Sequence, residues 1–117
     1  MRKKKSSGSN KKLERDFQRG VVKDIKNMFE GCIVTKLDPS HTQGIPDLLV
    51  LHKDKWATLE CKRNAKAERQ PNQEYYVNKM NEMSFSRFIY PENKEEEVLN
   101  ELRETFRRWG LSCIFGG

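Results

Sequence analysis

The chain has 117 residues, which is enough for one domain with one modest core. Its hydrophobic fraction is 35% and its charged fraction is 34%, a balance that indicates a small soluble protein with a thin core. No apolar run approaches the roughly 18 residues of a membrane-spanning helix, and no apolar segment follows the basic N-terminus to form a signal peptide. We therefore exclude a transmembrane protein and expect a cytoplasmic one, with no membrane partner.

The net charge of +6 is distributed unevenly along the chain. Residues 1–12 contain six basic side chains and no acidic one, so the basic and acidic side chains of the remainder balance. A basic arm that also contains Ser and Gly is typically disordered and often contacts nucleic acid, although a solvated tail that maintains solubility fits equally well. We expect a disordered basic arm over residues 1–12 and a single domain over residues 13–117. The arm residues expected to contact nucleic acid are Lys3, Lys4, Lys5, Lys11 and Lys12.

The three cysteines, Cys32, Cys61 and Cys113, are far apart and form no Cys-x-x-Cys pair. Their odd number and spacing argue against a disulfide framework or a zinc site, and favour a reducing compartment. Each is better explained as a small buried hydrophobic residue than as a ligand or nucleophile.

The first half of the chain predicts one helix and three strands. Apolar residues recur at helical spacing over residues 11–30, and Gly31 then ends the helix. The β-branched segment 32–37 predicts a strand, and DPSHTQG at residues 38–44 predicts a loop. Residues 46–52 and 55–61 predict two strands around a tight turn, the first apolar on both faces as in a sheet covered on both sides.

The second half predicts two more helices and one or two strands. After a polar loop, residues 73–81 show helical spacing, residues 85–90 read as a strand, and residues 94–109 form a strong amphipathic helix. Residues 111–115 could add a short edge strand. The fold class expected is α/β, with a small mixed sheet of four to five strands flanked by helices.

Charged residues at the ends of the predicted hairpin form the candidate site. If Lys53 and Asp54 form the turn, Asp47 lies directly opposite Glu60, with Cβ atoms about 4.5–5.5 Å apart on the same face. Lys62 points to that face as well, because side chains alternate along a strand. Opposed carboxylates repel, and a divalent cation such as Mg²⁺ or Mn²⁺ would offset the repulsion. A metal, a water bound to it and an ammonium group are the parts needed to hydrolyse a phosphodiester.

With the Pro46-Asp47 and Glu60-Cys61-Lys62 motifs in this order, the sequence resembles the PD-(D/E)XK nucleases. It is similar within them to small virus-type replication-repair (VRR-NUC-like) nucleases and to phage Holliday-junction resolvases, over about residues 13–102. The family carries a glutamate on its N-terminal helix and a glutamine on the helix after the lysine, which Glu14 and Gln73 match. The arginine-rich signature of the virus-type group is absent.

This resemblance implies a restriction-endonuclease-like core and a Mg²⁺-dependent (or Mn²⁺-dependent) endodeoxyribonuclease, often a homodimer, without a small-molecule cofactor. It assigns metal binding to Asp47, Glu60, Glu14 and the backbone carbonyl of Cys61, and catalysis also to Lys62 and Gln73. A phage role in DNA replication, recombination or repair, with branched or junction DNA as substrate, is expected on the same basis. Further DNA contacts are expected from His41, Gly44 and Arg63.

Each of these assignments also has an alternative explanation that involves no catalysis or binding. A Glu-x-Lys pair can be a surface ion pair, an acid in the first turn of a helix favours the macrodipole, and a polar residue early in a helix needs no special reason. Two other functions are also consistent with the sequence. One is a non-catalytic nucleic-acid-binding module that keeps the nuclease fold, and the other is an interaction subunit with an ion-pair cluster.

Overall fold

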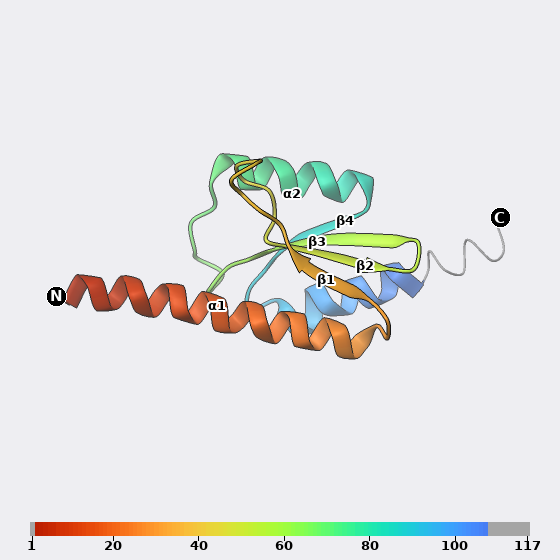
Figure 1. Ribbon diagram of the computed structural model, residues 1–117, viewed down its shortest axis with the longest axis horizontal. Coiled ribbons are helices and arrows are strands. Elements are labelled where there is room, and N and C mark those ends of the chain that lie inside the picture. The colour runs from red at the N-terminus through yellow and green to blue at the C-terminus, as the bar shows by residue number, and fades with distance from the viewer. Residues whose placement is uncertain (1, 108–117) are drawn as a thin grey trace.

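The computed structural model describes the backbone of residues 2–107 and the side chains of residues 11–107. The elements in chain order are α1 (Arg2–Met28), β1 (Ile33–Lys36), β2 (Leu48–His52), β3 (Lys55–Cys61), α2 (Pro71–Met83), β4 (Phe85–Ile89) and the π-helical η1 (Lys94–Leu99), which continues as α-helix over residues 100–107. They form three layers, with α2 on one face of the sheet and α1 together with the C-terminal helix on the other (Figure 1). The α/β class predicted from the sequence is confirmed.

The four described strands form one mixed sheet in the order β1-β2-β3-β4. β1, β2 and β3 pair antiparallel, with a loop over residues 37–47 between β1 and β2 and a tight turn between β2 and β3, whereas β4 lies parallel to β3. A parallel pair needs a crossover connection, and α2 supplies it by packing over β3 and β4. The predicted segment 111–115 lies outside the described residues.

The core lies between the sheet and the layer formed by α1 and the C-terminal helix. Val21 and Ile25 of α1 contribute to it together with Phe29, which follows the end of the helix, and their spacing of four keeps them on one side. They pack on alternate residues of the central strands and on the C-terminal helix. The fully buried strand residues in this cluster are Leu48, Val50, Ala57, Leu59, Cys61 and Ile89. Cys61 thus behaves as a buried hydrophobic residue, and Cys32 is half-buried with a free thiol.

α1 is longer than the sequence analysis predicted. We expected the helix to begin near Lys11 after a disordered arm, but the structure continues it back to Arg2 as one helix. Once residues 17–29 are packed, adding further turns requires no new nucleus, and no proline interrupts the segment. The helix therefore begins nine residues before the predicted start.

α2 begins two residues earlier than predicted, at Pro71 instead of Gln73. Proline suits the first helical position because its ring fixes φ and its missing N–H would be unpaired there in any case. Gln73 is therefore the third helical residue, and its Oε1 accepts a hydrogen bond from the Gln70 N–H at 3.0 Å. This contact caps the start of α2.

The prediction that β2 is covered on both faces is wrong. Leu48 and Val50 are buried against α1, but Leu51 on the opposite face is 38% exposed and its pairing partner Ile33 is 58% exposed. α2 covers β3 and β4 only, so this part of the face lacks a layer within the described residues (Figure 1). β3 and β4 are the strands that are covered on both sides.

A buried asparagine sets the start of the C-terminal helix. The Asn93 side chain donates to the Phe88 carbonyl at 3.0 Å and accepts from the Tyr90 N–H at 2.9 Å. The first turn then closes with the wider π-type bond from the Val98 N–H to the Asn93 carbonyl. Lys94 pairs with Asp24 of α1 at 2.5 Å, which joins the two helices of this layer. None of the helices in the described part of the chain is both long and apolar enough to cross a membrane.

Candidate active site

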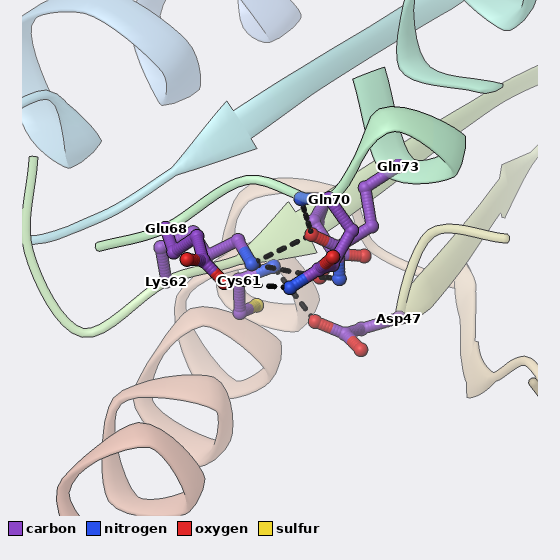
Figure 2. Close-up of polar contacts among 7 residues, drawn as sticks. Asp47, Cys61, Lys62, Glu68, Gln70 and Gln73 are labelled. Carbon is purple, nitrogen blue, oxygen red and sulfur yellow. Dashed lines mark hydrogen bonds and ion pairs between the residues drawn. The ribbon is translucent and has the colours of Figure 1, made fainter. Parts of the chain in front are cut away.

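The β2–β3 hairpin has the register that the sequence predicted. Leu48 pairs with Leu59 and His52 with Lys55, so the turn is formed by Lys53 and Asp54. Lys53 has a φ of 59°, the left-handed conformation that tight hairpin turns require. Continuing this register past Leu48 places Asp47 beside Glu60 and Cys61. The Cys61 N–H donates to Asp47 Oδ2 at 2.8 Å, a contact that fixes one carboxylate oxygen of Asp47 (Figure 2).

Gln73 joins the charged residues at the end of β3 into one network. Its Oε1 accepts from Lys62 Nζ at 2.8 Å, and its amide nitrogen donates to Glu60 Oε2 at 3.1 Å. Lys62 Nζ also lies 3.9 Å from the same Glu60 oxygen, Oε2. Figure 2 shows Gln70 and Gln73 approaching Lys62 from the start of α2, with Asp47 on the other side of the Cys61 backbone. One amide therefore orients both the ammonium and the carboxylate.

These side chains line a cavity of about 540 Å³ between the end of the sheet and α1. Asp47, Glu60, Lys62 and Gln73 form its sheet and α2 walls. The α1 wall consists of Lys11, Glu14, Arg15 and Gln18. Glu14 lies well inside α1, so its position does not reflect a preference of acids for the first turn of a helix. The structure thus brings Glu14 to the same cavity as the hairpin residues.

Burial dominates the electrostatics of the two hairpin carboxylates. Removal from water raises the pKa of Glu60 to about 8, and the charges of Asp47 and Glu14 add to the effect while Lys62 opposes it. Burial also raises the pKa of Asp47, although the hydrogen bond from Cys61 works against it. Perturbed carboxylates that share a cavity are a common mark of a functional site.

The donor set fits a hard divalent cation. Two carboxylates that share one buried face and repel one another are stabilised by a cation between them, and oxygen ligands suit Mg²⁺ or Mn²⁺. Among the described side chains, no group of three or more His, Cys, Asp and Glu residues is close enough to bind a metal. The candidate protein ligands with side-chain oxygens are accordingly the Asp47 and Glu60 pair, and Glu14 faces them across the cavity.

Other residues predicted to contact DNA lie around the cavity or away from it. Lys11 lines it, whereas Lys12, His41 and Arg63 are exposed and are not among its lining residues. Gly44 lines an adjoining cavity of about 420 Å³ that Gln73 also lines. The side chains of Lys3, Lys4 and Lys5 lie outside the described part of the structure.

Arg15 and Gln18 line the cavity but were not identified from the sequence. The signal was present in the spacing, since Arg15 follows Lys11 by four residues and Gln18 follows Glu14 by four. Residues four apart lie on the same helix face. Because the resemblance had already assigned Glu14 to the site, the same helix face indicated Gln18 as well.

No protein-family model matches the sequence, and no curated protein matches it either. Among solved structures, a VRR_NUC domain is similar in fold, with a TM-score of 0.56 and 23% sequence identity. The match covers 67% of this chain and 83% of the other. The resemblance stated from the Pro-Asp and Glu-x-Lys motifs is therefore confirmed at the level of the fold: the chain has a fold similar to that of a VRR_NUC domain.

Proposed function

We propose that the protein is a divalent-metal-dependent nuclease that hydrolyses phosphodiester bonds in DNA. The observation that carries the proposal is the cavity in which Asp47 and Glu60, both with raised pKa values, face Lys62 and Gln73. The VRR_NUC-like fold supports it, since this hairpin is where the superfamily resemblance placed the catalytic motif.

Asp47, Glu60 and the Cys61 carbonyl would hold the cation, with Glu14 on the facing wall of the cavity. A bound Mg²⁺ or Mn²⁺ supplies Lewis-acid stabilisation of charge on the phosphate and lowers the pKa of a bound water. The chain itself orients the remaining groups. Hydrogen bonding to Cys61 holds the Asp47 carboxylate, and Gln73 holds the Glu60 carboxylate.

Lys62 is the residue that meets the substrate in this proposal. Gln73 takes one of its three N–H donors at 2.8 Å, which fixes the ammonium in the cavity and leaves two donors. Those donors can bind a phosphate oxygen or position the attacking water. A positioned cation stabilises negative charge that develops in the transition state, and it does so most strongly in a site with little water.

Branched or junction DNA, cut by a homodimer acting in phage DNA replication, recombination or repair in the host cytoplasm, is the finer part of the proposal. A domain of this size leaves little room for a module that reads bases, which favours recognition of DNA structure over sequence. A dimer would present two sites to opposed strands. The exposed apolar pair Ile33 and Leu51 supports an interface on the sheet face that α2 leaves open.

The experiment compares linear duplex, flap, single-stranded and four-way-junction DNA, each incubated with Mg²⁺, with Mn²⁺ and with chelator. We expect metal-dependent cleavage that is fastest on a branched substrate. Asp47→Asn, Glu60→Gln and Lys62→Met each remove a charge with little change in shape, and each should lower the rate by about 10²-fold or more.

Glu74→Gln is the matched control, because Glu74 is an exposed carboxylate next to Gln73 that does not line the cavity. It should cleave at the wild-type rate. Full activity in one of the three site variants would remove that residue from the proposed mechanism. DNA binding without cleavage of any substrate in either metal would instead identify a non-catalytic binding module.

A further inference from the structure

Basic side chains continue along α1 beyond the cavity that contains the carboxylates. We propose that Arg15, Arg19 and Lys36, together with Lys11, form a phosphate-binding track that leads one DNA strand into the site along the side of α1 that faces β1. The proposal rests on the proposed function, since it names the surface by which the substrate reaches that site. Arg15, Arg19 and Lys36 would be positioning residues.

The track joins two adjacent cavities. Lys11 and Arg15 line the cavity that contains Asp47 and Glu60, whereas Arg19 and Lys36 line a second cavity of about 260 Å³ between α1 and β1. Gln18 lines both, so the two cavities meet at this residue. The four cations therefore border two neighbouring cavities, the first of which contains the candidate catalytic residues.

Helix geometry gives the track a length that suits a nucleic-acid backbone. Lys11, Arg15 and Arg19 are spaced by four, so they lie on one side of α1 and span about 12 Å along its axis. One strand of duplex DNA carries a phosphate about every 3.4 Å along the axis, so this span corresponds to three or four phosphates. Lys36 on β1 faces the track from the other side of the second cavity.

Little negative charge offsets Arg19 and Lys36, the two cations of the second cavity. The second cavity has no carboxylate among its lining residues. Arg19 lies 3.7 Å from Asp16, but both side chains are at least half exposed, and such a surface pair is worth little.

The opposite side of the site has a different character. The adjoining cavity beside α2 is lined by Pro39, Gln43, Gly44, Gln70, Pro71, Asn72 and Gln73, none of which carries a charge. Phosphates attract cations independently of base sequence, so the basic side of the site is the side that should follow the DNA backbone. The charge asymmetry thus gives the bound strand a direction across the protein.

The test uses the triple variant Arg15→Gln, Arg19→Gln, Lys36→Gln in the full-length protein. Binding of fluorescently labelled duplex and four-way-junction DNA is measured by anisotropy in chelator between 50 and 200 mM salt. Each lost phosphate contact should flatten the slope of log affinity against log salt by about 0.7–0.9, so we expect a change of about 2–3 and at least a tenfold loss of affinity near 0.1 M salt.

The control triple variant is Lys53→Gln, Lys79→Gln, Arg103→Gln, which removes the same charge from exposed positions outside both cavities. It should keep the wild-type slope. Arg15→Lys with Arg19→Lys should also keep most of it, because the proposed role requires charge alone. In the cleavage assay with Mg²⁺, the track variant should raise KM more than it lowers kcat.

The possible outcomes separate this proposal from the nuclease assignment. Normal cleavage by the wild type, combined with an unchanged salt slope and KM in the track variant, would overturn the track and leave the nuclease in place. Equal losses in the track and control variants would overturn it as well, because total charge would then be responsible. A wild-type protein that neither binds nor cleaves DNA would overturn both.

Discussion

Glu60 is almost fully buried, and burial of a carboxylate is unfavourable for the stability of the fold. Its exposed fraction is 4%, and a neighbouring carboxylate, Asp47, opposes its ionisation. Lys62 and Gln73 contact it but do not compensate for the lost hydration, since its pKa remains at about 8. A protein without such a site would gain stability from a neutral residue here. The carboxyl is therefore better explained by the cation that it can bind than by the stability of the fold.

This environment predicts that the metal-free protein loses stability as pH rises. The pKa of Glu60 is raised in the folded state, so the folded protein binds this proton more tightly than the unfolded chain does. The associated stability is fully present below the ordinary carboxyl pKa of about 4.5 and is lost as pH rises through about 8. In chelator, the free energy of unfolding in urea should fall between pH 5 and pH 8 by an amount on the order of a few kcal/mol.

Glu60→Gln supplies the comparison, because an amide has no proton to lose and should flatten this part of the pH profile. Adding Mg²⁺ or Mn²⁺ at pH 8 should stabilise the wild type more than the variant, since the cation replaces the proton. An identical pH dependence in the two proteins would show that Glu60 does not titrate in this range.

Gln73 shows why a single residue can be difficult to assign from sequence. Its match to the superfamily helix suggested a catalytic role, and its place early in a helix suggested none. In the structure it caps α2 through Gln70 and also contacts Lys62 and Glu60. One side chain thus positions the helix start and the charged groups together, a combination that depends on how α2 is placed over β3.

At the scale of elements, the loop between β1 and β2 determines where the start of α2 can lie. Gly44 has a φ of 91°, and a Cβ at this position would lie 2.4 Å from the Cβ of Asn72 in α2. The loop therefore approaches α2 more closely than a residue with a side chain permits. Because Asn72 precedes Gln73, this contact helps to hold Gln73 over Glu60 and Lys62.

Gly44→Ala should therefore destabilise the protein through both backbone strain and a clash with α2, by about 2–4 kcal/mol. Gly31→Ala is a matched control, since Gly31 has a φ of 81° but a Cβ there would meet no atom within 4 Å. Strain alone should cost that variant only about 1 kcal/mol. Urea unfolding of both variants tests the difference. An equal loss in the free energy of unfolding would show that the close approach to Asn72 does not contribute to stability.

At the scale of the whole molecule, the two faces of the sheet are covered unequally. α1 and the C-terminal helix cover one face, but α2 covers only the β3–β4 half of the other among the described residues (Figure 1). On the uncovered half, Ile33 and Leu51 pair across neighbouring strands and both expose apolar side chains. Apolar side chains grouped on one face are typical of a protein interface when they form a patch.

If this face forms the proposed homodimer, Leu51→Lys should shift the protein toward the monomer and raise the dimer Kd at least tenfold. A lysine placed in an apolar contact must be desolvated without a partner, which costs binding free energy. Sedimentation equilibrium measures the effect. Leu13→Lys introduces the same change at an exposed leucine of α1 and should leave the Kd unchanged. A wild type that is monomeric at every concentration would contradict the homodimer.

The strand and helix pattern and the register of the β2–β3 hairpin could be predicted from the sequence, because alternation, turn residues and pairing across a tight turn are local properties. That register was enough to place Asp47 opposite Glu60 and Lys62 on the same face. Three features could be seen only in the folded chain: Arg15 lines the site, β2 is covered on one face only, and Gln73 bridges Lys62 and Glu60. These features depend on how helices distant in sequence pack on the sheet, and periodicity does not specify that placement. Arg15, Arg19 and Lys36 were not identified from the sequence for this reason. Only the packing shows that Arg15 lines the cavity of the carboxylates and that Arg19 and Lys36 line the cavity next to it.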